Sequence, residues 1–213
     1  MRKIFITGIG TGIGKTVVSA VVTEALNADY WKPLQCGLDE ETDTEKVKRL
    51  ISNTKSVIHP EAYRLKMPAS PHAAAAAENI SLRISDIIAP ETSNYLVIEG
   101  AGGLMVPLNE SELIVDLIRS LNANVIVVIK QYLGSINHSI LTLQALLQKN
   151  IPVLGVVLNG APNKESEQAI FSFCKYPVLG RIEEERVFTP EVIKRYADEF
   201  QSSVALKSLA TKK

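Results

Sequence analysis

Short apolar runs rich in β-branched residues alternate with longer amphipathic segments along this chain. The runs predict strands at 3–7, 95–99, 124–129, 153–158 and 178–182. Between them, apolar residues spaced three to four apart predict helices at 15–26, 111–121, 137–149, 164–174 and 190–200. This alternation is typical of an α/β fold, in which helices cover both faces of a mostly parallel central sheet.

Residues that mark the ends of structural elements predict one further helix and no domain boundary. Ser70-Pro71, just before the alanines at 73–77, predicts the start of another helix, with Ser70 as N-cap and Pro71 in the first turn. No proline- or serine-rich linker and no repeat divides the sequence. We therefore expect a single domain over residues 1–213.

Composition excludes several classes of protein. With 46% hydrophobic residues and 23 Lys+Arg against 23 Asp+Glu, the chain is neither disordered nor a strongly basic nucleic-acid binder. Cys36 and Cys174 are far apart and belong to no metal-binding motif, so we expect reduced thiols. The apolar run at 4–6 is too short for a signal peptide, and no stretch is long enough to span a membrane. The expectation is a cytoplasmic protein that binds neither membranes nor nucleic acid.

A glycine-rich segment that ends in Gly14-Lys15-Thr16 follows the first predicted strand and precedes a predicted helix. In this context glycines let backbone N–H groups converge on phosphate, the lysine reaches the β- and γ-phosphates, and the threonine hydroxyl ligates Mg²⁺. Five residues separate Gly8 from Gly14-Lys15, one more than in the strict phosphate-binding loop. A dinucleotide-binding loop is disfavoured, because its third glycine would be misplaced.

Charged residues follow other predicted strands at the edge where ligands bind in such sheets. Glu99 ends an apolar strand before a glycine-rich loop, in the position of a metal-binding acid, with a solvated strand-end glutamate as the alternative. Lys32, at the end of a further strand and held extended by Pro33, either points toward the same phosphates or is a surface lysine. Asp43 opens a helix, where it is either a metal ligand or an ordinary first-turn acid.

Two asparagines near later strands allow more than one interpretation. Asn137 follows Gly134 and is either a substrate contact or the cap of its helix. Asn159-Gly160 ends another strand and is either an adenine-reading site or an ordinary turn.

Four segments together resemble the dethiobiotin synthetase family. They are Thr7-Gly8-x5-Gly14-Lys15-Thr16, Lys32-Pro33-x3-Gly37, Glu99-Gly100-Ala101-Gly102-Gly103 and Gly134-x2-Asn137-His138. Ser70-Pro71-His72 and Leu179-Gly180-Arg181-Ile182 fit as well, so the resemblance extends from about residue 2 to about residue 183. The longer phosphate loop is the form that this family has.

The resemblance implies a P-loop NTPase fold, a homodimer, and the substrates ATP, carbon dioxide (or bicarbonate) and 7,8-diaminononanoate, with Mg²⁺ as cofactor. It implies catalytic roles for Thr11, Lys15 and Lys32, and Mg²⁺ ligation by Thr16, Asp43 and Glu99. The ATP-binding positions that it implies are Gly12, Ile13, Gly14, Lys15, Thr16, Val17, Asp43, Glu99, Gly100, Ala101, Gly102, Asn159 and Gly160. It implies substrate contacts by Cys36 and, across the dimer, by Gly134, Ser135 and Asn137.

The chain departs from the family pattern at three positions. Cys36 stands where some members have serine, and a thiol is the weaker hydrogen-bond donor. Gly12 replaces a glutamate found in some members. Glu183-Glu184-Glu185 follow Ile182 where proline and apolar residues are common, which leaves the preferred nucleotide open.

The expected reaction is an ATP-dependent ring closure through a carbamate and a carbamic–phosphoric anhydride, catalysed by a ligase without a side-chain nucleophile. The main alternative is a P-loop ATPase switch of the partitioning or site-selection type. That class carries a second lysine in the loop, where this chain has Ile9. Two further alternatives are an amidotransferase-type synthetase and a regulatory nucleotide sensor. The first would need a glutaminase domain. Only an activity assay would distinguish the second from an enzyme.

Overall fold

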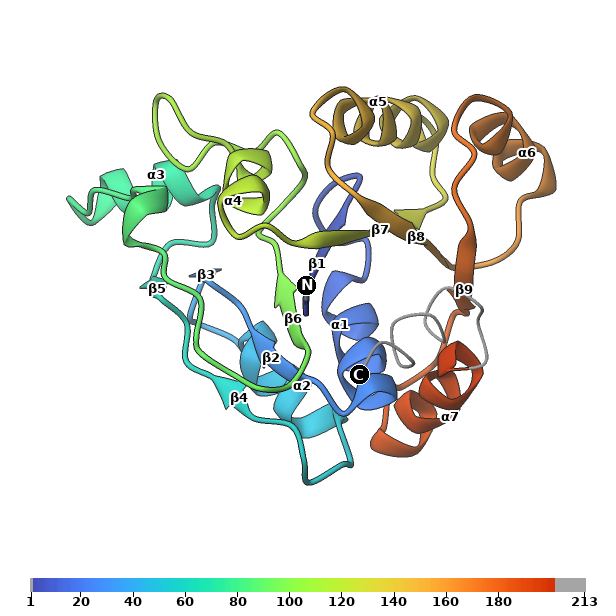
Figure 1. Ribbon diagram of the computed structural model, residues 1–213, viewed down its shortest axis with the longest axis horizontal. Coiled ribbons are helices and arrows are strands. Elements are labelled where there is room, and N and C mark those ends of the chain that lie inside the picture. Colours follow the sequence, from blue (N-terminus) through green and yellow to red (C-terminus); the bar gives the residue numbers. More distant parts are fainter. Residues whose placement is uncertain (1, 202–213) are drawn as a thin grey trace.

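A seven-stranded parallel sheet forms the centre of the computed structural model, which describes residues 2–201 (Figure 1). The strand order is β4-β2-β6-β1-β7-β8-β9. The strands are β1 (Lys3–Gly8), β2 (Asp29–Trp31), β4 (Ile58–His59), β6 (Leu96–Glu99), β7 (Asn124–Lys130), β8 (Val153–Asn159) and β9 (Val178–Ile182). The predicted α/β class is thereby confirmed.

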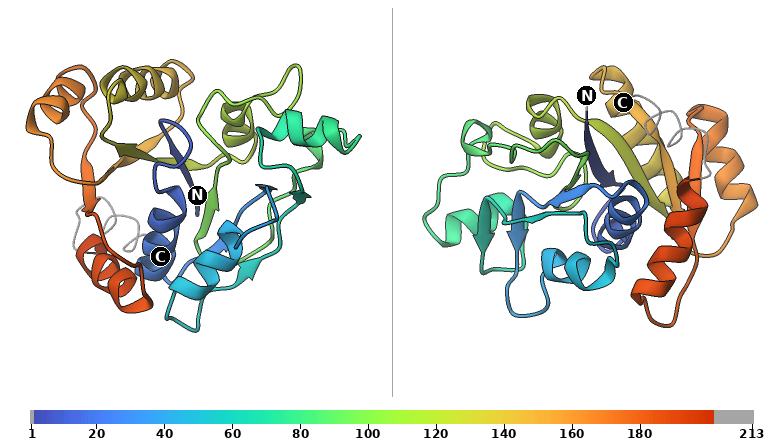
Figure 2. Two further views of the ribbon diagram at one scale, coloured as in Figure 1. Left: turned by 180° about the vertical axis from the view of Figure 1, so that it is seen from behind. Right: turned by 60° about the horizontal axis from the view of Figure 1, so that its bottom comes forward.

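Helices cover both faces of this sheet. Figures 1 and 2 show α4, α5 and α6 on one side and α1, α2 and α7 on the other, while α3 lies beside the small second sheet. The helices are α1 (Lys15–Leu26), α2 (Asp43–Leu50), α3 (Pro71–Ala77), α4 (Ile114–Ser120), α5 (Ser135–Gln148), α6 (Lys164–Phe173) and α7 (Pro190–Gln201), with a 3₁₀ turn η1 (Ile84–Asp86).

The second sheet is an unpredicted element. It pairs β3 (Leu34–Cys36) with β5 (Tyr63–Leu65) in parallel and lies next to α3. Its strands have three residues each, too few to show an alternating pattern in the sequence. The second sheet nevertheless matters for the site, because Gln35 and Cys36 lie on it.

Two helix starts differ from those expected. Helix α4 begins at Ile114 rather than at 111, because the side chain of Asn109 accepts hydrogen bonds from the backbone of Ser111 and Glu112 and holds them in a turn. Helix α5 begins at Ser135, directly after Gly134 in the left-handed region, so Asn137 lies inside the first turn. The interpretation of Asn137 as a helix cap is therefore wrong.

The N-terminus of helix α3 also differs from the prediction in how it is capped. Pro71 occupies the first turn as predicted, and Ser70 precedes it with extended backbone. The Ser70 hydroxyl makes no cap, however, and instead lies 3.0 Å from Nδ1 of His72.

The register of the central strands brings their carboxyl ends together. Ile6 of β1 pairs with Glu99 of β6, and Gly8 pairs with Val128 of β7. The strand interiors are fully buried, as at Phe5 and Ile98. The residues that leave β1 and β6 therefore emerge side by side at one edge of a rigid core.

The opposite edge is held by a buried carboxylate. Asp29, 2% exposed, accepts hydrogen bonds from Val57 N (2.9 Å), Thr92 Oγ1 (2.6 Å) and Asn94 Nδ2 (2.9 Å), and Nε2 of His59 lies 3.3 Å away. Burial works to raise the pKa of Asp29, but the hydrogen bonds outweigh it and hold this pKa below its ordinary value of 3.8. Asp29 thus joins β2 to the segments before β4 and β6.

We expect Asp29→Asn to lower the free energy of unfolding by about 2 kcal/mol at pH 7, because it removes a charged acceptor from buried donors. A depressed carboxyl pKa stabilises the fold above the unfolded value of 3.8 and ceases to do so as the pH falls through the folded value. The difference between wild type and variant should therefore shrink below about pH 4. Urea unfolding at pH 7 and pH 3.5 measures it, with the exposed Asp39→Asn as control. A difference that does not depend on pH would contradict this account.

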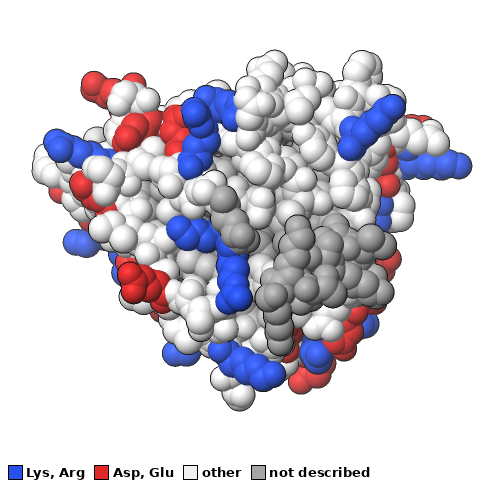
Figure 3. Space-filling view, viewed as in Figure 1, with Lys and Arg blue, Asp and Glu red and all other residues white. Residues whose placement is uncertain are grey.

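Charge is dispersed on the face drawn in Figure 3, where uncharged residues cover most of the area and basic and acidic groups both occur. This agrees with the formal net charge of zero. Among residues 2–201, no helix combines the length and the apolar character that crossing a membrane would need.

Candidate active site

The phosphate-binding loop connects β1 to α1, and its glycines adopt conformations that other residues rarely take. Gly12 and Gly14 have φ of +68° and +92°. A Cβ on Gly14 would lie 2.3 Å from Nδ2 of Asn159, which donates a 2.7 Å hydrogen bond to the carbonyl of Ile13. The loop is therefore braced by β8 at the start of α1, where backbone N–H groups are available to an anion.

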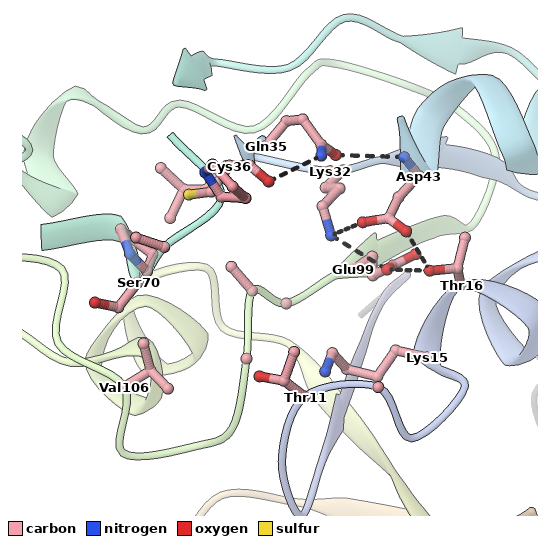
Figure 4. Close-up of a pocket in the computed structure, with 18 of the residues that line it drawn as sticks. Thr11, Lys15, Thr16, Lys32, Gln35, Cys36, Asp43, Ser70, Glu99 and Val106 are labelled. Carbon is pink, nitrogen blue, oxygen red and sulfur yellow. Dashed lines mark hydrogen bonds and ion pairs between the residues drawn. The ribbon is translucent and has the colours of Figure 1, made fainter. Parts of the chain in front are cut away.

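Beside this loop, side chains from four elements converge. Nζ of Lys32 lies 2.8 Å from Oδ2 of Asp43 and 3.2 Å from Oε1 of Glu99. Oγ1 of Thr16 lies 2.5 Å from Oδ1 of Asp43 and 2.9 Å from the same Glu99 oxygen. Lys32 and Glu99 are 4% and 1% exposed, so this cluster is largely shielded from water (Figure 4).

The electrostatics differ between the two lysines. Burial works to lower the pKa of Lys32, but Glu99 and Asp43 outweigh it and raise this pKa above the ordinary value. Within residues 2–201 Lys15 forms no ion pair, and its Nζ donates to the carbonyl of Gly10 at 2.8 Å. Burial lowers the pKa of Lys15 to about 8, with Glu99 opposing the shift. Lys32 is thus in direct contact with two carboxylates, whereas Lys15 feels the charge of Glu99 without an ion pair among the described residues.

The oxygen atoms around Thr16 fit a divalent cation. A hydroxyl has a single hydrogen, yet carboxylate oxygens of both Asp43 and Glu99 approach Oγ1 of Thr16. This one hydrogen can therefore serve only one of the two carboxylates, so the other brings an oxygen close to Oγ1 without a hydrogen between them. Mg²⁺ binds hard oxygen ligands and takes one or two carboxylates together with substrate phosphates and water. Thr16, Asp43 and Glu99 are accordingly the residues that would hold it.

The cluster lies in a cavity of about 710 Å³ that extends away from the phosphate loop. In Figure 4 the charged residues occupy one end, while Cys36, Ser70 and Val106 lie at the other. The predicted site residues that line it are Thr11, Gly12, Gly14, Lys15, Thr16, Val17, Lys32, Cys36, Asp43, Glu99, Gly100, Ala101 and Gly102. One cavity thus offers a phosphate end and a less charged end.

The other predicted site residues lie outside this lining. The side chain of Ile13, in the phosphate loop, is buried. Asn159 donates a hydrogen bond to the Ile13 carbonyl. Gly160 accepts a hydrogen bond from Arg181 at 3.0 Å. Gly134, Ser135 and Asn137 lie at the start of α5, where Gly134 and Asn137 are exposed and Ser135 is buried. Within one chain, the substrate positions on α5 are not brought to the cavity.

Sequence reasoning missed several residues of the site. Gln35 donates to the carbonyls of Cys36 and Gly37, and its Oε1 lies 3.4 Å from the backbone N of Asp43. Lys46 lines the cavity one helical turn after Asp43. Position 35 falls within the Lys32-Pro33-x3-Gly37 segment, and an i, i+3 spacing links Asp43 to Lys46, so both signals were present. The remaining residues of the lining that were not predicted are Leu34, Pro68, Ala69, Ser70, Pro71 and Val106.

Two departures noted in the sequence now have a physical description. Burial raises the pKa of the Cys36 thiol, with Lys32 opposing, so Cys36 lines the cavity as a neutral thiol. Of the acidic run, Glu185 pairs with Arg195 and accepts from the Tyr196 hydroxyl at 2.7 Å. Glu184 approaches Gly160, since its Oε1 lies 3.9 Å from a Cβ built there.

Solved structures that are similar to this fold include a septum site-determining protein and a ParA family ATPase. The septum site-determining protein MinD from Pyrococcus horikoshii, complexed with Mg-ADP, has a TM-score of 0.56 at 14% identity over 100% of this chain and 99% of its own. A ParA family ATPase from Chlorobium tepidum has a TM-score of 0.53 at 12% identity, over 100% of this chain and 95% of its own. At such identities the likeness shows the fold alone. The AAA domain family matches residues 2–192, and the chain is of the P-loop NTPase class.

Curated relatives narrow this class. The ATP-dependent dethiobiotin synthetase BioD of Christiangramia forsetii is 52% identical over 94% of this chain and 96% of its own length. That of Cytophaga hutchinsonii is 50% identical over 92% and 96%, and that of Chlamydia pneumoniae is 42% identical over 94% and 90%. This chain belongs to the dethiobiotin synthetase family. The family resemblance and the expected class of enzyme, an ATP-dependent ligase, are thereby confirmed.

Proposed function

We propose that this chain catalyses the ATP-dependent carboxylation and ring closure of 7,8-diaminononanoate with carbon dioxide, which yields dethiobiotin, ADP and phosphate. One observation carries the proposal beyond family membership. The cavity that is lined by Lys15, Lys32 and the two carboxylates is lined at its other end by Cys36 and Val106. A simple ATPase needs room for water beside the terminal phosphate, whereas a ligase needs room for a second substrate there.

The proposed reaction has three steps that balance. One amine of the substrate adds to carbon dioxide and loses a proton to give a carbamate. A carbamate oxygen displaces ADP from the γ-phosphorus, which forms a carbamic–phosphoric anhydride. The second amine then attacks the carbonyl carbon and loses a proton, the bond from this carbon to the phosphate oxygen breaks, and the cyclic urea closes as phosphate leaves. No side-chain nucleophile takes part, so the protein acts by positioning its reactants and stabilising charge.

The residues of the site have separate tasks in this scheme. Lys15 leaves the Gly10 carbonyl to contact the β- and γ-phosphates, and Lys32 faces the transferring group from the opposite side. Thr16, Asp43 and Glu99 hold Mg²⁺, which when bound neutralises phosphate charge. Thr11 lies on the loop between the two ends of the cavity. We assign adenine binding to Asn159 and Gly160, at the end of β8 beside the phosphate loop. We place the reaction in the cytoplasm, where thiols stay reduced.

The decisive experiment measures phosphate release from MgATP and bicarbonate with and without 7,8-diaminononanoate, together with the mass of the product. Release that requires the diamine and yields a cyclic urea would support the proposal. Steady hydrolysis that is indifferent to the diamine would overturn it and favour the alternative, a P-loop ATPase switch of the partitioning type.

A homodimer belongs to the same proposal, supported by an apolar surface at the start of α5. Leu133 is completely exposed, and Tyr132 and Ile136 beside it are 42% and 37% exposed. This surface adjoins Gly134, Ser135 and Asn137, which do not line the cavity of their own chain. A second copy of the chain would cover the apolar residues and bring these three to the diamine.

We expect Leu133→Glu to convert a dimer into a monomer and to raise the KM for the diamine by about tenfold or more, because it places a charge in the apolar contact. Light scattering coupled to gel filtration reports the mass, and steady-state kinetics reports the KM. Leu147→Glu is the matched control, since Leu147 is 58% exposed at the other end of α5. A monomeric wild type, or a dimer that survives the Leu133 variant, would exclude this interface.

A further inference from the structure

The hydroxyl of Tyr30 makes a contact that the reaction scheme above does not use. It donates a 2.9 Å hydrogen bond to Oε2 of Glu99. Tyr30 is 0% exposed and Glu99 is 1% exposed, so water does not compete for this hydrogen bond. It is a charge-assisted hydrogen bond in a dry environment, where such interactions are strong.

Sheet geometry explains how the two residues meet. Tyr30 on β2 pairs in register with Val97 on β6. Side chains alternate between the two faces of a strand, so Val97 and Glu99 lie on the same face as Tyr30. Glu99 is two residues further along the strand from the residue opposite Tyr30, a diagonal distance that a long aromatic side chain can span. A smaller side chain on β2 would leave Glu99 without this partner.

The two oxygens of Glu99 have different tasks as a result. Oε2 accepts from Tyr30, whereas Oε1 lies 2.9 Å from Oγ1 of Thr16 and 3.2 Å from Nζ of Lys32. A carboxylate that is hydrogen-bonded through one oxygen cannot rotate freely about its last bond. The Tyr30 hydroxyl therefore keeps Oε1 on the side where the phosphate loop and Asp43 lie.

We propose that Tyr30 is a positioning residue of this ligase, whose hydroxyl orients the Glu99 carboxylate for Mg²⁺ bound with the nucleotide. The proposal rests on the proposed function only in its choice of metal and nucleotide. Hydrogen-bond partners of metal ligands fix ligand orientation, and their loss typically weakens metal binding by about 10- to 100-fold. Tyr30 acts through Glu99 and touches no substrate.

The test is Tyr30→Phe, which removes only the hydroxyl. We expect the half-saturating Mg²⁺ concentration for turnover to rise by about 10-fold, with a smaller change in the KM for the diamine. A second readout needs no catalysis: the rise in melting temperature caused by Mg²⁺ with ADP, relative to ADP with EDTA. That Mg²⁺-dependent increment should shrink in Tyr30→Phe, while the increment caused by ADP alone stays.

Thr92→Val is the matched control, because it also deletes a hydroxyl that donates to a buried carboxylate, that of Asp29 at the far edge of the sheet. It should lower the melting temperature and leave the Mg²⁺ response unchanged. Adding Tyr30→Phe to Glu99→Gln should not weaken Mg²⁺ binding further. In this double variant, loss of the Tyr30 hydroxyl does not leave a charged carboxylate at position 99 without its donor.

Each result decides the proposal. A wild-type Mg²⁺ response in Tyr30→Phe, or an equal loss on both backgrounds, would show that the hydroxyl serves only stability. Failure of the proposed function would look different. The diamine would then not stimulate phosphate release by the wild type, whereas the Mg²⁺–ADP readout would still report on Tyr30.

Discussion

Replacing Lys32 with alanine is expected to lower diamine-dependent phosphate release by about 10²- to 10³-fold, the cost of losing one charge aimed at a transferring group. Lys32 is buried and already oriented by Asp43 and Glu99, so it loses no freedom when nucleotide binds. The loss should therefore appear in kcat more than in the KM for ATP. Lys32→Arg should not restore the rate, because a planar guanidinium cannot occupy the place of a compact ammonium.

The control for this prediction is Lys48→Ala, which removes the same charge from an exposed position on α2. Circular dichroism of both variants separates loss of folding from loss of rate, since Lys32→Ala leaves two neighbouring carboxylates without their cation. Turnover within about threefold of wild type for a folded Lys32→Ala, a small part of the expected loss, would remove Lys32 from the catalytic machinery.

Lys15→Ala is expected to lower kcat/KM for ATP by a comparable factor, about 10²- to 10³-fold, but by a different route. Among residues 2–201, Nζ of Lys15 is hydrogen-bonded to the carbonyl of Gly10 and to no carboxylate, so we expect its ion partner to arrive with the nucleotide. Both ground-state binding and the transition state then depend on it, and the KM for ATP should rise as kcat falls. Titration with a non-hydrolysable ATP analogue measures the binding part directly.

Wild-type affinity for this analogue should also fall as the pH rises above about 8. The pKa of Lys15 is lowered to about 8 by burial in the empty site, and a bound triphosphate favours the charged amine. Above that pH the free enzyme must take up a proton on binding, which weakens affinity by up to about tenfold per pH unit. Lys15→Ala should show no such slope between pH 7 and 9.5. Equal slopes in both proteins would assign the proton to another group.

Much of this site could be predicted from the sequence. Gly14, Lys15 and Thr16 follow each other directly, and a strand and a helix flank them, so local rules suffice to place them at a phosphate. Glu99 could be predicted because it ends an apolar run in a chain that alternates strands and helices. Both predictions depend on the few residues around each position.

Tyr30 could not be predicted in the same way, and Gln35 and Lys46 were missed although a family segment and an i, i+3 spacing pointed to them. The three-residue strands β2 and β3 show no periodicity, so the faces of Tyr30 and Gln35 were unknown. The predicted start of α5 was wrong because asparagine and glycine are both acceptable N-cap residues, and the sequence did not show that Gly134 takes this position. The single-domain expectation and the roles of Gly134, Ser135 and Asn137 across a dimer stay predictions.

By itself the sequence determined the parallel α/β class, the phosphate loop and the family, because periodicity, glycine spacing and short motifs are local properties of the chain. Only the tertiary structure decided that Lys32 and Thr16 both contact the carboxylates of Asp43 and Glu99. It also decided that the Tyr30 hydroxyl donates to the other oxygen of Glu99. The residues that meet at Glu99 are 67 to 83 positions away in sequence. Their contacts follow from strand order and register, which depend on the packing of the whole core.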